Sequence, residues 1–378
     1  MTHVASSPPD RLLIVQPWFN ARGHPAQSLL HVARALRAEP GIRYLVPATQ
    51  PDPELATLAS ELDAIAHVER FPSRSRSLPV NTVRALPALA RLIARQPQPP
   101  RIFFQDAHLV SLAAVAPWVL PWDGSVAVAA LYLAGPERIM ANRATRAVVS
   151  RFLSRPWVRL MLRTDELAQA WRASQPSSVA ARIVTLPSLD LALPVMDTAT
   201  EFALPPIRFG VFGQVRPGKS LDRLVPLFAL RPELGRLTVA GPFVSEAHRR
   251  EMSFLSKHPD FIDRFLPEEE MLRCAASQHY LLMLYDHWDH RMEAATLSLA
   301  AAVRRPPLLY NLGWGGRMIA RFGCGVAVAP DLDLAVAIAS LPTPGDAAYR
   351  GLQAGLDRYR DAHSPERLCP QTLTILLG

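Results

Sequence analysis

Short apolar runs alternate with amphipathic segments along most of the chain. The runs at 11–17 (RLLIVQP), 101–104 and 125–133 are bounded by turn residues, as buried strands of a parallel sheet are. Between such runs, apolar residues recur at helical spacing, for example at 29–36 and 85–95. Strands that alternate with helices in this way predict an α/β fold with a parallel sheet covered by helices.

The most informative stretch is 207–225, which reads IRFGVFGQVRPGKSLDRLV. Its pattern predicts a buried strand, a turn with glycines at 213 and 218, and a helix capped by Ser220. Lys219 lies where the turn meets the helix, and free backbone amides and the helix dipole favour an anion there. The segment is therefore expected to hold a phosphate group.

The length of the chain indicates two domains. Its 378 residues suit two domains of about 190 residues, each large enough for its own core. Periodicity is lost at 193–206, where Pro and Thr accumulate, so we expect the linker there. The first domain is expected at 1–192, the second at 207–345, and a C-terminal helical segment that crosses back to the first domain at 346–378.

The net charge and the cysteine content indicate which binding partners and which cellular compartment to expect. The net charge of +8 comes far more from Arg than from Lys, which suits nucleotide diphosphates or anionic lipid headgroups. No basic block is interleaved with aromatic residues, so nucleic acid is not expected. Cys274, Cys324 and Cys369 lack metal-ligand or redox spacing, and neither a secretion signal nor a long apolar run is visible. A cytoplasmic protein is expected.

In residues 207–225 and in the order of its elements, the sequence resembles the retaining family-four glycosyltransferases of the GT-B fold. In that family the second domain opens with a strand that ends in Gly, and a Lys after the turn contacts the diphosphate of a nucleotide-sugar donor. Gly213 and Lys219 stand at these positions. Gln214 replaces the usual Arg, which makes Arg216 the candidate for the missing charge.

Part of the same stretch also matches a second sequence motif. Residues 213–220 fit the P-loop of nucleoside triphosphatases, with 280–286 (YLLMLYD) as the acidic partner strand. Pro217, however, removes one of the backbone N–H groups that should surround the phosphates, and a long α/β sequence precedes this loop. The P-loop hypothesis is therefore the weaker alternative.

The resemblance also assigns the donor sugar to the loop that follows 281–285. Members of the family carry two glutamates eight residues apart; Glu293 lies near the first position, and no carboxylate exists at the second, around 299–301. Glu293 could orient the donor or stabilise positive charge at the anomeric carbon. The GWGGR segment is expected to be a glycine-rich loop, in which Gly315, Gly316 and Arg317 approach the diphosphate.

A metal site is a further alternative at this loop. His287, His290 and Glu293 follow one another at three-residue spacing and would stack on one face if the segment were helical. The neighbouring Asp and Trp residues favour a hydrogen-bonded loop instead, so no metal is expected.

Residues for the acceptor are expected in the first domain. Gly23, His24 and Gln27 lie in the loop after the first strand, which in the resemblance faces the interdomain cleft. His108 follows the strand at 101–104, at the carboxyl end where α/β sheets place ligands. Both histidines are candidates to orient the reacting hydroxyl or take its proton, and both have the alternative of capping the next helix.

The resemblance thus implies two Rossmann-like, doubly wound α/β domains of the GT-B type that face a central cleft. It implies transfer of a sugar from a nucleotide-diphosphate donor to a hydroxyl acceptor, with retention of configuration and no obligatory metal or cofactor beyond the nucleotide-sugar co-substrate. The acceptor classes are a saccharide, a lipid-linked saccharide or a natural product.

Two alternatives accompany this interpretation. Gln214 and the missing second carboxylate motivate a non-catalytic scaffold built on the same fold. The basic segment 71–78 and Arg138, Arg143 and Arg146 allow peripheral contact with the inner face of a membrane, against the simpler explanation of solvated charges.

Overall fold

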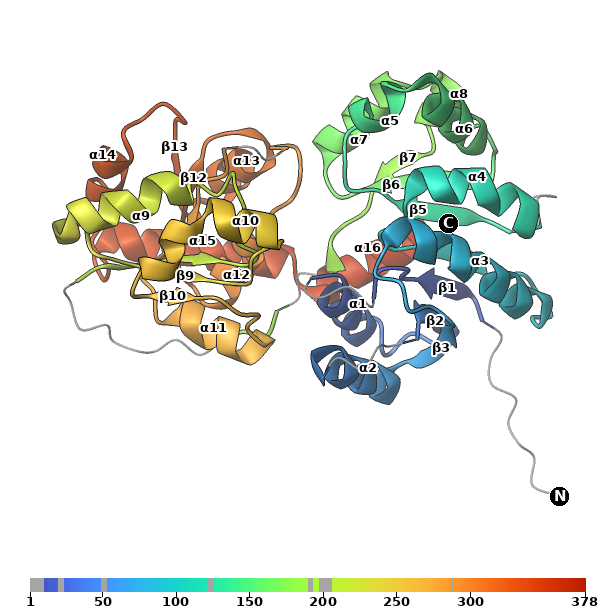
Figure 1. The fold of residues 1–378 in the computed structure, drawn as a ribbon. Coiled ribbons are helices and arrows are strands. Elements are labelled where there is room, and N and C mark those ends of the chain that lie inside the picture. Colours follow the sequence, from blue (N-terminus) through green and yellow to red (C-terminus); the bar gives the residue numbers. More distant parts are fainter. Residues whose placement is uncertain are drawn as a thin grey trace. The chain divides into compact units, whose positions relative to one another are not determined.

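The chain folds into two compact α/β units (Figure 1). The structure, a computed structural model, describes residues 10–19, 24–48, 53–121, 126–189, 193–196, 206–286 and 289–378, with the backbone alone at 24, 53 and 54. The first unit comprises Met1–Ala192 and Pro365–Gly378, and the second comprises Leu193–Ser364. Each unit is described by itself, so the expected cleft between the domains stays a prediction.

Within the described residues, the first unit holds a seven-stranded parallel sheet in the order β3-β2-β1-β4-β5-β6-β7. The strands are β1 (Leu12–Val15), β2 (Ile42–Pro47), β3 (His67–Phe71), β4 (Arg101–Phe104), β5 (Val128–Leu131), β6 (Val158–Leu162) and β7 (Ile183–Thr185). Its helices are α1 (His24–Ala35), α2 (Pro53–Ile65), α3 (Leu78–Ala94), α4 (Leu109–Val119), α5 (Glu137–Met140), α6 (Arg143–Leu153), α7 (Asp165–Ala173), α8 (Ser177–Ala180) and α16 (Pro365–Leu377).

The described part of the second unit contains a six-stranded parallel sheet in the order β10-β9-β8-β11-β12-β13. The strands are β8 (Arg208–Phe212), β9 (Arg236–Ala240), β10 (Phe261–Ile262), β11 (Tyr280–Met283), β12 (Pro307–Tyr310) and β13 (Val326–Val328). Its α-helices are α9 (Leu221–Leu230), α10 (Glu246–Glu251), α11 (Glu268–Ala276), α12 (Ala295–Ala302), α13 (Gly313–Phe322), α14 (Leu334–Ala339) and α15 (Ala347–Ala362), and short 3-10 helices cover Pro232–Leu234 and Ser253–Lys257.

Continuous burial explains why the strand sequences are apolar rather than alternating. Every residue of β1 is buried, because helices cover both faces of the sheet. Leu12 and Ile14 pack in one core with Leu29 of α1, and Leu368 of α16 joins the same core from the far end of the chain. The expected fold class, two doubly wound α/β domains, is confirmed.

The strand order reverses beside the first strand of each sheet. In the first unit this point lies between β1 and β4, and in the second it lies between β8 and β11. Neighbouring connections leave in opposite directions there, so the carboxyl ends of these strands border the crevice in which doubly wound sheets bind ligands.

None of the helices formed by the described residues combines the length and the apolar character that crossing a bilayer requires. Cys274, Cys324 and Cys369 are free thiols.

Two glycines of α15 provide a matched test of packing. A Cβ atom on Gly355 would lie 2.1 Å from the carbonyl oxygen of Gly323, whereas one on Gly351 would meet no atom within 4 Å. Gly355→Ala should therefore lower the free energy of unfolding by about 2 kcal/mol or more. Gly351→Ala should raise it by about 0.5–1 kcal/mol, because Ala is the better helix former. Urea denaturation of both variants checks this, and equal effects would contradict the described contact between α15 and residue 323.

Candidate functional site

The carboxyl end of β8 carries a buried lysine. Gly213 follows the strand with φ +84°, and the chain returns at Lys219, one of only two lysines in the sequence. The Lys219 side chain is 6% exposed, and its Nζ donates a hydrogen bond of 2.7 Å to the carbonyl oxygen of Phe212. The ammonium group thus lies over the end of β8, at the point where the strand order reverses.

Arg216 brings a second positive charge to the same place. Burial, together with the smaller effect of repulsion by Arg216, lowers the pKa of Lys219 from 10.5 to about 7. Burial also lowers the pKa of Arg216. Two partly desolvated cations at a strand end are costly without an anion, so the arrangement favours a negatively charged ligand.

Ser220 and Asp286 connect β8 to β11. Ser220 adopts φ +50°, and its hydroxyl lies 2.6 Å from Oδ2 of Asp286 and 2.8 Å from the carbonyl oxygen of Leu284. The backbone N–H of Asp286 donates to the carbonyl oxygen of Gly218 at 2.9 Å. The expectation that Ser220 caps the helix is therefore wrong in part: it precedes α9, but its side chain makes no capping hydrogen bond.

Tyr310, the last residue of β12, extends this network. Its hydroxyl accepts a hydrogen bond of 3.2 Å from Nη1 of Arg223 on α9. The same guanidinium lies 3.7 Å from Oδ1 of Asp286. Burial raises the pKa of Tyr310, so the phenol stays protonated and neutral. The network fixes the start of α9 and hence the turn that contains Lys219.

The turn offers fewer free amides than a P-loop. The N–H of Gly213 donates to the carbonyl oxygen of Ala240 at 3.0 Å, and the N–H of Val215 donates to that of Pro242 at 2.8 Å. Val215 also forms an isolated parallel bridge with Phe243. Because these two amides extend the sheet and Pro217 has none, three positions of the turn cannot donate to a triphosphate. The geometry disfavours the P-loop hypothesis.

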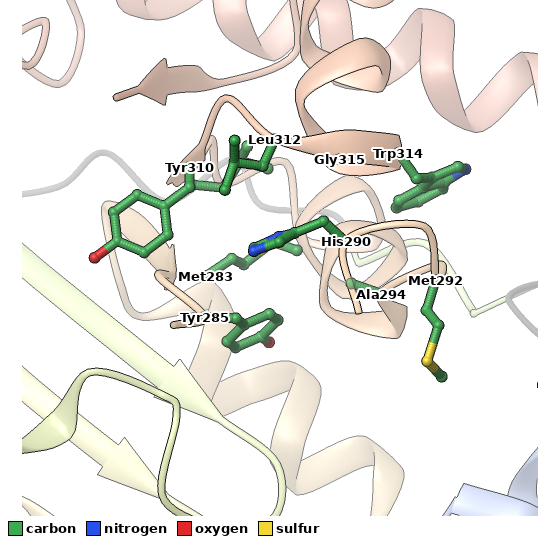
Figure 2. Close-up of a pocket in the computed structure, with 10 residues that line it drawn as sticks. Met283, Tyr285, His290, Met292, Ala294, Tyr310, Leu312, Trp314 and Gly315 are labelled. Atoms are coloured by element: carbon green, nitrogen blue, oxygen red, sulfur yellow. The ribbon is translucent and has the colours of Figure 1, made fainter. Parts of the chain in front are cut away.

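A small pocket opens at the carboxyl ends of β11 and β12 (Figure 2). Its volume is about 30 Å³, well below the several hundred Å³ of most ligand sites, so the pocket by itself is too small for a ligand of that kind. In Figure 2 the ring of His290 lies near the centre of the lining residues. The lining is Met283, Tyr285, His290, Met292, Ala294, Leu309, Tyr310, Leu312, Trp314 and Gly315.

Gly315 and Gly316 lie in the first turn of α13 and not in the expected loop. The N–H of Trp314 donates to the carbonyl oxygen of His290 at 2.7 Å, which ties the helix start to the preceding loop. Gly316 is required for packing, since a Cβ there would lie 2.7 Å from the carbonyl carbon of Asn311. The same atom on Gly315 would meet only Leu309, at 3.5 Å. Arg317 is exposed on the same turn.

Glu293 lies in the segment that leads into α12 and is partly buried. At the position of the second family glutamate, Leu299, Ala300 and Ala301 are almost completely buried in α12. A contact to ribose therefore cannot come from this part of the helix. His287 lies outside the described residues, and the described residues contain no cluster of three or more potential metal ligands.

The first unit has its own polar cluster where its strand order reverses. Gln16 follows β1 and is fully buried, and its Nε2 donates to Oδ2 of Asp106 at 2.9 Å. Asp106 follows β4 with φ +62°, a conformation that non-glycine residues adopt at a cost of about 1–3 kcal/mol. Gln105 beside it donates from Nε2 to Oγ of Ser28 on α1 at 2.8 Å. The cluster holds a carboxylate at the edge where a ligand is expected.

His108 is the N-cap of α4. Its Nδ1 accepts a hydrogen bond of 3.3 Å from the N–H of Ser111 and lies 2.8 Å from the Ser111 hydroxyl. Burial lowers the pKa of His108, which keeps the ring neutral. Since Nδ1 accepts, the ring proton belongs on Nε2. The capping alternative is thus the one that the structure shows, and Nδ1 is already engaged.

The remaining first-domain candidates fall near α1. Gly23 lies outside the described residues, and so does the side chain of His24, whose backbone begins α1. Gln27 is half-buried within the first turn of α1, so its expected position in a loop is wrong.

Sequence reasoning missed several polar residues that the structure places at strand ends. Gln16, Tyr285 and Tyr310 each follow or end a buried strand, and the hydroxyl of Tyr285 lies 3.0 Å from Oγ1 of Thr296. The available signal was a polar or phenolic residue directly after an apolar run, which in a parallel sheet marks the carboxyl edge.

Comparisons with known proteins identify the fold. No protein-family model matches the chain, and no curated protein matches its sequence. Among solved structures, Anabaena HepE in complex with UDP-glucose has a TM-score of 0.70 at 12% identity, covering 97% of this chain and 98% of that chain.

Two other structures share the same architecture. A glycosyltransferase from Rickettsia africae has a TM-score of 0.64 at 12% identity, covering 97% of this chain and 98% of that chain. A UDP-N-acetylglucosamine 2-epimerase has a TM-score of 0.57 at 12% identity, covering 97% and 96%. At such identities the likeness shows the fold, which is the expected GT-B arrangement of two Rossmann-like domains.

The pKa of Lys219 has a measurable consequence for stability. Because it is lowered from 10.5 to about 7, the unfolded chain binds a proton between these pH values that the folded chain does not. The free energy of unfolding should therefore rise with pH across this window, relative to Lys219→Met, by roughly 3–5 kcal/mol. Urea denaturation from pH 6 to pH 10.5 measures this difference, with Lys257→Met at an exposed position as the control. Parallel curves for wild type and Lys219→Met would show that the ammonium is not buried.

Proposed function

We propose that this protein transfers a sugar from a nucleotide-diphosphate donor to a hydroxyl acceptor. The observation that carries the proposal is the pair of desolvated cations, Lys219 and Arg216, at the strand-order reversal of the second unit. A diphosphate is the anion that suits them, because it carries charge on two adjacent groups.

The similar structures support a nucleotide-sugar ligand. HepE was solved with UDP-glucose and with UDP, and the Rickettsia protein is described as a glycosyltransferase. A UDP-N-acetylglucosamine 2-epimerase shares the fold, so the architecture also serves another reaction on nucleotide sugars. Binding of a nucleotide sugar is the feature that these reactions have in common.

In the proposed mechanism, Lys219 and Arg216 stabilise the charge that develops on the leaving diphosphate as the bond to the anomeric carbon breaks. Amides at the start of α13, near Gly315, Gly316 and Arg317, add partial positive charge. Gly213 and Gln214 form the exposed turn beside the lysine, which leaves room for the phosphates to approach. The chain thus supplies its own cations, and the proposal needs no obligatory metal.

The sugar and the acceptor are assigned to other residues. Glu293 is proposed to orient the donor hexose or to stabilise positive charge at the anomeric carbon, with retention of configuration. On the acceptor side, the Nε2–H of His108 is proposed to orient the reacting hydroxyl, with Gly23, His24 and Gln27 as further contacts. The buried Asp106 is a further candidate proton acceptor.

Removal of the lysine charge should weaken donor binding. Lys219→Met should lower the affinity for UDP-glucose, the first probe, by roughly 10–100-fold, because a charge-assisted contact to phosphate is lost. Arg216→Met should have a smaller effect, and Lys257→Met should have none. Isothermal titration calorimetry measures all three. If UDP-glucose fails to bind, a panel of other nucleotide sugars decides the donor; unchanged affinity in Lys219→Met would overturn the proposed site.

Donor binding should also depend on pH. A bound diphosphate favours the protonated lysine, so binding above pH 7 requires the uptake of a proton. The dissociation constant should then rise by up to about tenfold per pH unit above pH 7. The dependence should vanish in Lys219→Met, and calorimetry in two buffers of different ionisation enthalpy would detect the proton directly.

The alternative is a scaffold that binds a nucleotide sugar or nothing at all and transfers no sugar. Gln214 and the buried apolar residues at 299–301 favour it, since they remove two contacts of the resembled family. Labelled donors and an acceptor library distinguish the two functions. Labelled product that disappears in Glu293→Gln would support catalysis, and NMR of that product would show whether configuration is retained. Binding without product or hydrolysis would favour the scaffold.

A further inference from the structure

Three helices of the first unit, α3, α4 and α6, form one layer (Figure 1). The central helix α4 packs against α3 on one side and α6 on the other. Each helix therefore buries one side and presents the other to solvent. The exposed sides of these helices, here called the α3–α4–α6 face, are unusual in both polarity and charge.

The middle of this face is apolar. Along α4, the residues that reach solvent at helical spacing are Ala114, Pro117 and Trp118, and the Trp118 side chain is 87% exposed. The adjoining α3 adds Val80 and Val83, which are 39% and 36% exposed. A tryptophan side chain this exposed contributes little to the stability of the fold, and such residues commonly mark an interface.

Arginines flank the apolar strip on both sides. Exposed arginines lie along or directly after α3 and along α6, and in the described chain no carboxylate pairs with them: Arg84, Arg91, Arg95, Arg143, Arg146 and Arg151. Across 74–119 and 137–155 the acidic side chains are Asp106, which is buried, and Glu137 at the start of α5. Over these described residues, the face is therefore strongly positive.

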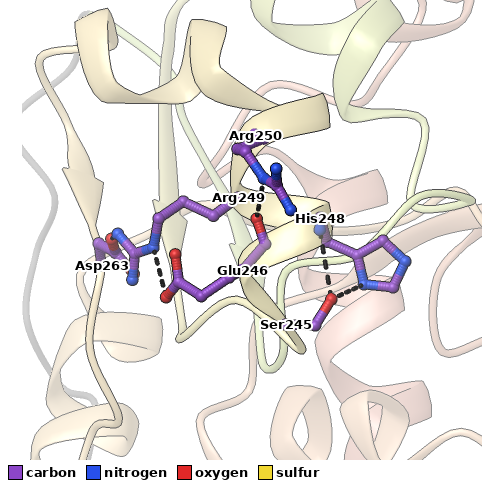
Figure 3. Close-up of polar contacts among 6 residues, drawn as sticks. All are labelled: Ser245, Glu246, His248, Arg249, Arg250 and Asp263. Atoms are coloured by element: carbon purple, nitrogen blue, oxygen red, sulfur yellow. Dashed lines mark hydrogen bonds and ion pairs between the residues drawn. The ribbon is translucent and has the colours of Figure 1, made fainter.

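The exposed arginines of α10 in the second unit behave differently (Figure 3). There Arg249 forms ion pairs with Asp263 and Glu246, and its guanidinium lies 4.8 Å from the ring centroid of Phe243. Arg250 donates from Nε to the carbonyl oxygen of Glu246 at 3.4 Å. Carboxylates thus neutralise Arg249. On the α3–α4–α6 face, Arg84 and Arg91 donate, among the described residues, only to uncharged oxygens, those of Ser73 and Pro87, so their charges stay available to an external anion.

We infer that the α3–α4–α6 face docks on the surface of an anionic lipid bilayer. Trp118 and the valines enter the headgroup and acyl boundary, and the flanking arginines contact lipid phosphates. A nucleic-acid duplex fits less well, because it presents phosphates to the arginines but no apolar surface to the strip. The inference does not depend on the proposed sugar transfer.

Vesicle sedimentation tests the inference on the full-length chain. At low salt the protein should bind vesicles of phosphatidylcholine with about 30 mol% phosphatidylglycerol, and not vesicles of phosphatidylcholine alone. Added salt should weaken binding. Since each arginine near the surface contributes roughly fivefold, Arg84, Arg146 and Arg151→Glu together should reduce partitioning at least 100-fold. Trp118→Ala should reduce it about tenfold.

Matched variants control for net charge and for general hydrophobicity. Arg250, Arg273 and Arg321→Glu together make the same change in net charge at exposed positions of the second unit and should leave binding unchanged. Leu230→Ala removes another exposed apolar side chain, 79% exposed on α9, and should also have no effect. Circular dichroism and calorimetry with UDP-glucose verify that each variant is folded and separate this result from the fate of the donor site.

Three outcomes would overturn the inference. These are no binding to anionic vesicles at low salt, an equal loss of binding in the second-unit control, and tighter binding to single-stranded RNA than to vesicles, abolished by the same three substitutions. The last outcome would assign the face to nucleic acid instead.

Discussion

The contact between the Lys219 ammonium and the Phe212 carbonyl is the interaction on which the second unit is organised. It places a nearly buried positive charge at the end of β8, and Arg216 adds a second charge that makes the first more costly. The surrounding hydrogen bonds of Ser220, Asp286 and Tyr310 hold the turn in position. A site that holds two desolvated positive charges so close together is preorganised for a ligand of opposite charge.

Much of the fold could be predicted from the sequence, because apolar runs such as 11–17 and 207–212 are long, continuous and bounded by turn residues. The position of Lys219 followed from the same strand–turn–helix pattern. The helical conformation of Gly315 and Gly316 could not be predicted, because two adjacent glycines disfavour a helix. Only the contacts of the Trp314 amide and of Gly316 with neighbouring backbone show why α13 begins there. The sequence likewise predicted Ser220 as a cap, but its hydroxyl bonds instead to the carboxylate of Asp286, which is distant in the sequence.

The first unit illustrates a different limit of sequence reasoning. Asp106 and Gln16 are 90 residues apart, and their pairing requires β1 and β4 to be neighbours with a known register. Nothing local in either segment indicates a buried carboxylate with positive φ. For His108 the local sequence states two roles, a helix cap or a contact to the reacting hydroxyl, and favours the cap. The hydrogen bond from the Ser111 amide shows the cap at Nδ1 and leaves Nε2 for the proposed contact.

The return of α16 to the first unit has a consequence for synthesis. Residues 365–378 supply Leu368 and Leu376 to the core of the first unit, and Arg159 on β6 donates to the carbonyl oxygens of Ile375 and Gly378 at 3.0 and 2.8 Å. A ribosome delivers this helix after every residue of the second unit has been made. The second unit can therefore complete its core first, while the core of the first unit keeps an apolar surface uncovered until the last helix is made.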